Sequence, residues 1–396
     1  MAGSLLRQWP GKVDKAIFSL LCLLFFLLPC STSPAVIAGG LLLLVWLLSG
    51  KFLAGRSEYL GRGWTLPVAL LFLLPFAGLA YSPYPELGLK LAEKSYYWLF
   101  AFALATLDTQ ERDRRNLVYF FLAGVGVSVV VSFLQHLGLL PLHRDATATG
   151  FMNHINYGLF LVMAITLLTF LIKKSGSPGN RRALTVVLVL FAVNLALSPS
   201  RAGLLAFLAL SPLMIVTLLG RRNLVIVIVA SVVLGSSLFL SPVVRQRVDL
   251  AVDEVSRFQS EGKVESSIGL RLVMWEGALR IFADNPVIGA GTGGYASEMQ
   301  KYRRDSGTDD IKHPHNSYLY MAASYGTLGL LLLLWLLWAL LRKGWRQREE
   351  LGGFAVLTFT LVFIVGSFTD TQVLTYSTGV MAALMTGLRL GQPPGA

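Results

Sequence analysis

The sequence predicts an all-α polytopic membrane protein of about 12 transmembrane helices, and two observations point to this class. The 396-residue chain is 54% hydrophobic and 14% charged, whereas a soluble domain carries roughly 25% charged residues. Apolar runs of about 20 residues, the length needed to cross a bilayer, recur from end to end. Because backbone polar groups inside a bilayer must pair within each segment, these runs predict helices.

Twelve spans are expected, with one large loop between the ninth and the tenth. This divides the chain into spans one to nine (1–241), the loop (242–314), and spans ten to twelve with a short tail (315–396). The predicted spans are 16–31, 35–50, 66–81, 88–107, 116–136, 154–172, 183–198, 201–219, 223–241, 315–341, 354–368 and 372–388.

The connecting loops divide into two alternating sets with very different positive charge. One set, which includes "GKFLAGRSEYLGR", "KKSGSPGNRR" and "RKGWRQR", holds with Arg389 about 20 Lys or Arg residues, and the other set holds two. We therefore expect both termini in the cytoplasm and the large loop on the outer side. The net charge of +12 then reflects this bias and does not indicate a nucleic-acid partner. All five histidines fall on the outer side: His136, His143, His154, His313 and His315.

The large loop is expected to contain two helices. The run "VVRQRVDLAVDEVSRF" predicts an amphipathic helix lying on the membrane. Ser267 can cap the second helix, "IGLRLVMWEGALRIF". Arg271 lies on the apolar stripe of that helix and is predicted to face inward, whereas Arg280, nine residues later, faces outward. The stripe comprises Trp275, Ala278, Leu279 and Phe282.

The glycines of "DNPVIGAGTGGY" follow this second helix. They resemble a dinucleotide-binding loop only superficially, because no βαβ unit surrounds them.

His315 is the main candidate for proton transfer. Asn316 is expected to cap span ten, which places His315 at the N-terminus of that helix. The positive end of the helix dipole favours the neutral imidazole that a general base requires. The alternative is an interfacial histidine whose ring is satisfied by a carbonyl. His313 and Asn316 are candidate substrate-binding residues beside it, although His313 follows Lys312 and an exposed position without a role is the alternative.

Arg201 is a candidate for binding an anion. It lies in the first turn of span eight, where its guanidinium and the positive helix N-terminus converge on one point. This combination suits a phosphate group. An arginine that reaches lipid headgroups at the membrane surface is the alternative.

Two further clusters on the outer side are candidate substrate-binding sites. Asn153, His154 and Asn156 open span six, where the amides can bind sugar hydroxyls or cap the helix. Lys90 and Lys94 share a face with Glu93 at the start of span four, where they can meet a lipid-linked diphosphate or form an interfacial ion-pair cluster.

The outer inventory of arginines, histidines and amides suits binding a diphosphate and abstracting one proton. The sequence shows no Asp/His cluster with clear metal-ligand spacing and no carboxylate pair of the kind a glycosidase uses. It also shows no nucleotide loop and no serine nucleophile with an obvious base. We therefore expect no metal site and no cofactor.

Four segments, in this order, resemble the O-antigen ligase and polymerase superfamily: "GFMNHIN", "SPSRAGLLAF", "RLVMWEGALRIFADNPVIGAGTGGY" and "HPHNSYLYMAASYGTLGLL". The resemblance covers most of the chain. It implies a GT-C-like glycosyltransferase in the bacterial inner membrane that acts at the periplasmic face, without a metal and with inversion of the anomeric centre. Such ligases move a polysaccharide from undecaprenyl diphosphate to a terminal sugar of lipid A–core. Carried over by motif, Arg201 and Arg271 bind the donor diphosphate and His315 is the catalytic histidine.

Three activities of this superfamily share the same residues and stay open at this point. A ligase transfers to lipid A–core, a polymerase to a second lipid-linked repeat, and an O-oligosaccharyltransferase to a protein hydroxyl. We expect a ligase, with membrane lipids around it and a monomer or weak oligomer as its state. A transporter of lipid-linked glycans is the alternative from another class. It requires basic residues along the spans, whereas here they lie at the span ends.

Overall fold

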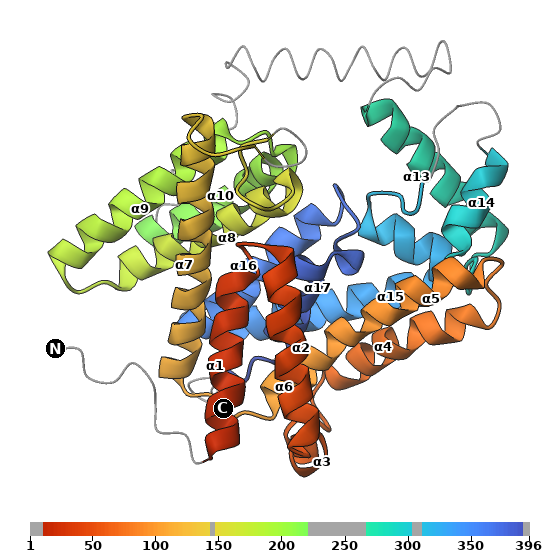
Figure 1. The fold of residues 1–396 in the computed structure, drawn as a ribbon, viewed down its shortest axis with the longest axis horizontal. Coiled ribbons are helices and arrows are strands. Elements are labelled where there is room, and N and C mark those ends of the chain that lie inside the picture. The colour runs from red at the N-terminus through yellow and green to blue at the C-terminus, as the bar shows by residue number, and fades with distance from the viewer. Residues whose placement is uncertain (1–10, 143–146, 221–266, 303–310, 391–396) are drawn as a thin grey trace.

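The computed structural model describes residues 11–142, 147–220, 267–302 and 311–390, and every regular element in these ranges is a helix (Figure 1). Short 3₁₀ helices cover Arg56–Glu58, Lys94–Trp98 and Gln372–Leu374. The α-helices are α1 (Lys12–Leu27), α2 (Thr32–Leu48), α3 (Lys51–Ala54), α4 (Thr65–Leu79), α5 (Pro85–Glu93), α6 (Leu99–Ala105), α7 (Glu111–His136), α8 (His154–Lys174), α9 (Pro178–Leu197), α10 (Arg201–Leu219), α13 (Ser267–Asp284), α14 (Gly294–Tyr302), α15 (Ser317–Arg346), α16 (Leu351–Gly366) and α17 (Tyr376–Gly387).

The protein is a polytopic membrane protein. Five of the described helices, α7, α8, α9, α10 and α15, are long and apolar enough to cross a bilayer, and α2, α4 and α16 are shorter apolar helices. Helices cover most of eleven of the twelve predicted ranges, and the remaining one, 223–241, lies outside the described residues. So does the predicted amphipathic helix of the large loop. The predicted fourth span is not one helix, because α5, a 3₁₀ segment and α6 divide it.

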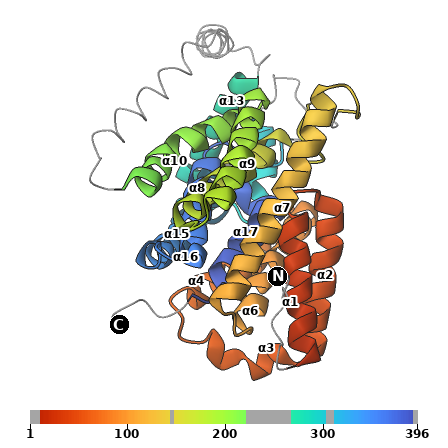
Figure 2. The ribbon, with the colours of Figure 1, turned by 90° about the vertical axis from the view of Figure 1, so that its left-hand side faces the viewer.

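The centre of the molecule is α8, whose residues from Ile155 to Leu171 are all buried. It packs against α7, α9, α10 and α16. Gly158 and Gly203 let the first turns of α8 and α10 approach closely, because a side chain at Gly158 would collide with Ser200. Helices α1, α2 and α7 stand side by side along one flank (Figure 2).

Helix α15 is broken near its start. Gly326 has φ of +63° and ψ of −159°, which separates a short N-terminal part from the long C-terminal part. The segment after α13 enters this break. There the N–H of Thr327 donates to Pro286 O at 2.8 Å, and the N–H of Ala290 donates to Ala323 O at 2.9 Å. The glycine-rich run therefore joins α13 to α15 by backbone hydrogen bonds. A Cβ added at Gly326 would collide with the Val287 backbone.

Helix α13 turns one face to the protein, and this face differs in part from the predicted stripe. Met274, Ala278 and Ile281 are buried, whereas Leu279 is 54% exposed, so its place on the stripe was wrong. The physical reason is that α13 packs against α14 and α15, and the contact follows a neighbouring row of residues. Arg271 is nevertheless half-buried and Arg280 is exposed, as predicted.

Candidate functional site

The N-terminus of α15 is capped as the sequence predicts. The Asn316 side chain accepts hydrogen bonds from the N–H groups of Tyr318 and Leu319 at 2.9 and 3.0 Å. Asn316 is buried by this role. Its side-chain oxygen therefore serves the helix, and its direct contact with a substrate stays a prediction.

The connector between α16 and α17 is bonded to this helix start. The N–H of Ser317 donates to Ser367 O at 2.8 Å, and the Ser317 hydroxyl donates to Asp370 O at 3.2 Å. The hydroxyl also accepts from the N–H of Gln372 at 2.8 Å. These bonds fix the residues before α15 against the residues after α16.

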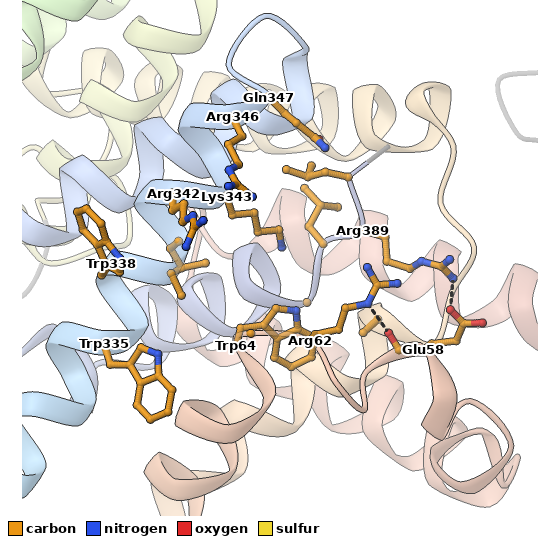
Figure 3. A pocket seen from close by; sticks show the side chains of 17 residues that line it. Glu58, Arg62, Trp64, Trp335, Trp338, Arg342, Lys343, Arg346, Gln347 and Arg389 are labelled. Carbon is orange, nitrogen blue, oxygen red and sulfur yellow. Dashed lines mark hydrogen bonds and ion pairs between the residues drawn. The ribbon is translucent and has the colours of Figure 1, made fainter. Parts of the chain in front are cut away.

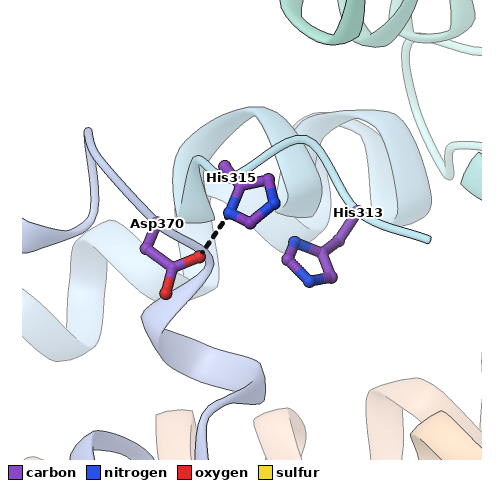
Figure 4. Close-up of side chains that lie close together, drawn as sticks. All are labelled: His313, His315 and Asp370. Carbon is purple, nitrogen blue, oxygen red and sulfur yellow. Dashed lines mark hydrogen bonds and ion pairs between the residues drawn. The ribbon is translucent and has the colours of Figure 1, made fainter. Parts of the chain in front are cut away.

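The fold thereby pairs His315 with Asp370, 55 positions later in the chain (Figure 4). His315 Nδ1 lies 2.9 Å from Asp370 Oδ1, and Asp370 Oδ1 also accepts from the Thr371 N–H at 2.8 Å. The His315 side chain stays 37% exposed, whereas that of Asp370 is 10% exposed. His315 has a φ of +47°, a left-handed conformation that is uncommon outside glycine. The carboxylate holds one ring nitrogen, and the other is left for a ligand.

The protonation of Asp370 decides which nitrogen that is. Burial raises the pKa of the Asp370 carboxyl, but the His315 hydrogen bond, the charges of His315 and His313 and the Thr371 N–H together hold it below its usual value. An ionised carboxylate can only accept, so Nδ1 of His315 carries the hydrogen and Nε2 keeps its lone pair. The carboxylate thus orients His315 through Nδ1, and the role of this histidine as a base stays a prediction.

His313 lies beside this pair and is not exposed, in contrast to the alternative considered for it. Its ring centroid is 4.4 Å from that of His315, and its Nδ1 lies 3.2 Å from the Thr371 hydroxyl. Burial, then the charge of His315, lowers the pKa of His313 to about 4, against a smaller opposing effect of Asp370. His313 is therefore neutral at pH 7.

Two arginines bring positive charge to the same place. Burial lowers the pKa of Arg271, Asp370 raises it, and Arg201 lowers it again, so the three charges are close enough to act on one another. The guanidinium of Arg271 still stays charged at neutral pH. Arg201 is the first residue of α10 and is exposed, with Ser200 as the cap that accepts from the Gly203 N–H at 3.0 Å.

Helix α13 is tied directly to the histidine segment. Trp275 Nε1 donates to Pro314 O at 3.0 Å, and Pro314 stands between the two histidines. Arg271, one turn before Trp275 on the same helix, is thereby held near His315. Arg280 instead forms an exposed ion pair with Glu276 at 2.5 Å.

Asn153, His154 and Asn156 lie at the start of α8, and one of them caps the helix. Asn153 is the cap of α8, because its side chain accepts from the Asn156 N–H at 2.8 Å. The side-chain oxygen of Asn156 is buried and has no hydrogen-bond partner among the described residues. His154 is half-buried in the first turn. The close contact of α8 with the start of α10 puts this turn near Arg201.

The two lysines of the predicted fourth span, Lys90 and Lys94, have different surroundings. Lys94 Nζ donates to Leu374 O at 3.0 Å, and its charge acts on His313, so it belongs to the site. Lys90 is exposed and lines a neighbouring cavity of about 260 Å³ with Lys312. No ion pair joins Lys90, Glu93 and Lys94 within the described part of the chain. His136 lies exposed at the end of α7, and His143 is outside the described residues.

Asp370 is the site residue that the sequence analysis missed. It lies between the predicted spans 354–368 and 372–388, and no spacing rule links a carboxylate there to a histidine 55 residues earlier. A carboxylate placed between two apolar runs on the outer side was the available signal.

His313, His315 and Asp370 also form a group that could hold a metal ion, because one potential ligand atom from each lies within 4.8 Å of the others. The expectation of no such cluster came from sequence spacing and did not anticipate this contact. The hydrogen bond to Asp370 occupies Nδ1 of His315, which fits a histidine oriented by a carboxylate. Removing divalent ions with EDTA tests whether this group holds a metal.

In this polytopic membrane protein, the fold places a histidine oriented by a carboxylate beside the charges of two arginines. This arrangement can deprotonate a hydroxyl next to a bound anion. Residues 186–334 match the family described as O-antigen ligase, which covers ligases and polymerases that transfer lipid-linked glycans. The match covers less than half of the chain, and in that part the chain is similar to this family. The match contains Arg201, Arg271, His313 and His315, and it ends before Asp370. No curated protein matches the chain.

Proposed function

We propose that the protein is an O-antigen ligase, which transfers the polysaccharide from undecaprenyl diphosphate to a terminal sugar hydroxyl of lipid A–core. The observation that carries this proposal is the His315–Asp370 pair at 2.9 Å. Arg271 interacts electrostatically with Asp370 and also with Arg201. The family match supports the class of reaction, and the choice of a ligase within it is our proposal.

The mechanism follows from these residues. The acceptor hydroxyl oxygen attacks the anomeric carbon of the first donor sugar while the bond from that carbon to the diphosphate oxygen breaks. His315 Nε2 takes the hydroxyl proton, and Asp370 stabilises the resulting imidazolium. Arg201 and Arg271 stabilise the negative charge that develops on the leaving diphosphate. One displacement of this kind inverts the anomeric centre and uses no metal.

We place the site at the periplasmic face of the bacterial inner membrane, with both termini in the cytoplasm, 12 spans and a GT-C-like arrangement. The Lys/Arg asymmetry of the loops supports this orientation. The histidine segment, the start of α10 and the connector after α16 all belong to the set of segments poor in Lys and Arg. The lipid-linked donor then reaches the arginines from the membrane.

The acceptor decides between ligase, polymerase and protein O-oligosaccharyltransferase. We would supply purified protein in detergent with undecaprenyl-diphosphate-linked glycan and offer lipid A–core, a second lipid-linked repeat, or an acceptor protein in separate reactions. Each reaction would be run with His315→Ala and with His136→Ala as the matched control, because His136 lies exposed at the end of α7. EDTA would be added to a parallel set.

A product on lipid A–core that is lost with His315→Ala, kept with His136→Ala and kept in EDTA is the expected result. A product on another acceptor would retain the mechanism and overturn the ligase assignment. Loss of activity in EDTA that is restored by a divalent ion would assign the His313–His315–Asp370 group to a metal. Donor binding without product on any acceptor would favour a transporter.

A further inference from the structure

A basic cavity lies along the last turns of α15, at the end of this helix away from His315. Figure 3 shows the side chains that line it. It has a volume of about 630 Å³ and is enclosed by the last turns of α15, the segment after α17 and the turn before α4. Among its described lining residues Glu58 is the one carboxylate. The cations that line it are Arg62, Lys343, Arg342, Arg346 and Arg389.

The positive charge of this cavity is only partly compensated. Glu58 pairs with Arg389 at 3.0 Å, and the backbone oxygen of Glu58 accepts from Arg62 Nε at 3.1 Å. Arg342 and Arg346 lie exposed one turn apart on α15, and no described carboxylate pairs with either. Since guanidiniums stay charged at any physiological pH, four of them face one carboxylate. The cavity is therefore a site for an anion.

Lys343 has a different role in the same wall. Its Nζ donates to Met385 O at 3.2 Å and to Thr386 O at 2.7 Å, which are carbonyls of the last turn of α17. A lysine at this position satisfies helix-end carbonyls. Lys343 thus joins α15 to α17, while the neighbouring Arg342 and Arg346 stay exposed.

An apolar stripe on α15 leads to the cavity. Leu328, Leu331, Trp335 and Trp338 are 52%, 56%, 43% and 66% exposed. Their spacing of three, four and three residues places them on one face of the helix, and Arg342 continues that face one turn later. Trp335 and Trp338 also line the cavity (Figure 3). Tryptophan is enriched where hydrocarbon meets headgroups, so this cavity opens at a membrane surface.

We infer that this cavity binds the headgroup of an anionic phospholipid, with the phosphate between Arg342 and Arg346 and the acyl chains along the Leu328–Trp338 stripe. Basic cavities between transmembrane helices suit such headgroups. A free anion would make no use of the exposed tryptophans and leucines, which is why we assign a lipid. The inference does not depend on the transfer reaction, because none of these residues belongs to the His315 site.

Equilibrium binding to the purified, delipidated full-length protein in neutral detergent tests this inference. The ligands would be phosphatidylglycerol, phosphatidylcholine, undecaprenyl phosphate and inorganic phosphate, each in its own titration. The variant Arg342→Ala/Arg346→Ala removes the two unpaired guanidiniums. Arg181→Ala/Arg182→Ala is the matched control, because it removes two exposed arginines from the start of α9, at the same end of the molecule and outside the cavity. Circular dichroism would check the helix content of each variant.

The expected result is phosphatidylglycerol binding that is about tenfold or more weaker in Arg342→Ala/Arg346→Ala and changed less than about threefold in the control. Equal binding of phosphatidylcholine, or unchanged affinity in the cavity variant, would refute a charge-selective site. Competition by micromolar inorganic phosphate would make it a free-anion site. Tighter binding of undecaprenyl phosphate, lost in the cavity variant, would assign it to the polyprenyl carrier and overturn the phospholipid.

Discussion

At the scale of single residues, the proposed chemistry of this protein depends on how His315 is held. The Asp370 carboxylate binds Nδ1, Trp275 binds the carbonyl of the preceding Pro314, and the backbone of His315 is left-handed. Each contact comes from a different part of the chain. Together they orient the ring so that Nε2 points away from the carboxylate, and the charge of Arg271 acts on Asp370.

Removing the charge of Asp370 should therefore affect catalysis more than donor binding. In Asp370→Asn the amide no longer stabilises the imidazolium, so we expect the transfer rate to fall on the order of 100-fold. Donor affinity should stay within a few-fold, because the two arginines remain. Initial rates and donor binding to the same preparation would check this. A near wild-type rate would show that Asp370 does not act through His315.

The two arginines of α13 give a matched pair of variants. Arg271→Ala should abolish transfer, because this half-buried guanidinium belongs to the site. Arg280→Ala removes an exposed ion pair with Glu276 and should retain most activity. Both variants would be assayed for transfer at equal amounts of folded protein. Equal losses would contradict the assignment of the inward and outward faces of α13.

His313 should make native stability depend on pH. Its pKa in the folded protein is about 4, below the usual histidine value of 6.5, so between these pH values the unfolded chain binds a proton that the folded protein does not. The wild type should thus lose stability relative to His313→Asn as the pH falls from about 6.5 to about 4. Thermal unfolding in detergent at pH 7 and pH 5 would measure this. The same pH effect in both proteins would exclude it.

At the scale of the elements, the break in α15 positions the site. The segment after α13 inserts at Gly326 and bonds to both sides of the break, while Trp275 bonds to the segment before α15. The segment after α13 is thereby bonded to α15, and α13 itself is bonded to the residues just before α15. This explains why the glycine-rich run lies between Arg271 and His315 in the sequence.

Adding one methyl group at the break should disturb this arrangement. Gly326→Ala places a Cβ at φ of +63° and against the Val287 backbone, which we expect to cost about 2 kcal/mol or more of unfolding free energy and most of the transfer activity. Gly40→Ala in α2 is the control, because a Cβ there meets no atom within 4 Å. Thermal unfolding and transfer rates would be compared. Equal stability of the two variants would rule out a required break.

At the scale of the whole molecule, the helices run between two chemically different ends. The end with His315 and Asp370 holds histidines, amides and two site arginines. The other end holds the cavity of Arg342 and Arg346 and most of the loop lysines and arginines. In Figures 1 and 2 α13 lies at the top and α3 at the bottom of the molecule. This separation is what the predicted orientation in the membrane requires.

Cysteine labelling would test that orientation. Cys22 and Cys30 are buried and give a low background. We expect Lys312→Cys, at the histidine end, to react with a membrane-impermeant maleimide in spheroplasts. Arg182→Cys, at the other end, should react only after the membrane is opened. Both positions are exposed. Reaction of Arg182→Cys from outside would reverse the assignment of the two faces.

Short-range patterns in the sequence were sufficient for most of the helices and for two of the capping residues. Helices cover most of eleven of the twelve ranges that hydropathy over about 20 residues predicted, and five of the described helices are long and apolar enough to cross a bilayer. Asn316 and Asn153 were recognisable as caps from their place before apolar helices, since capping involves residues only two or three positions away. Helical spacing was enough to predict that Arg271 faces inward.

Only the tertiary structure decided the contacts between distant segments. The pairing of Asp370 with His315 depends on how the α16–α17 connector bonds to the start of α15, which no local spacing encodes. The exposure of Leu279 and the insertion at Gly326 likewise depend on which neighbour each helix meets. The sequence by itself determined which residues form most of the helices, and it predicts which chemical groups face the outer side. Packing between helices decided the partner of each group, because its energy comes from contacts far apart in the chain.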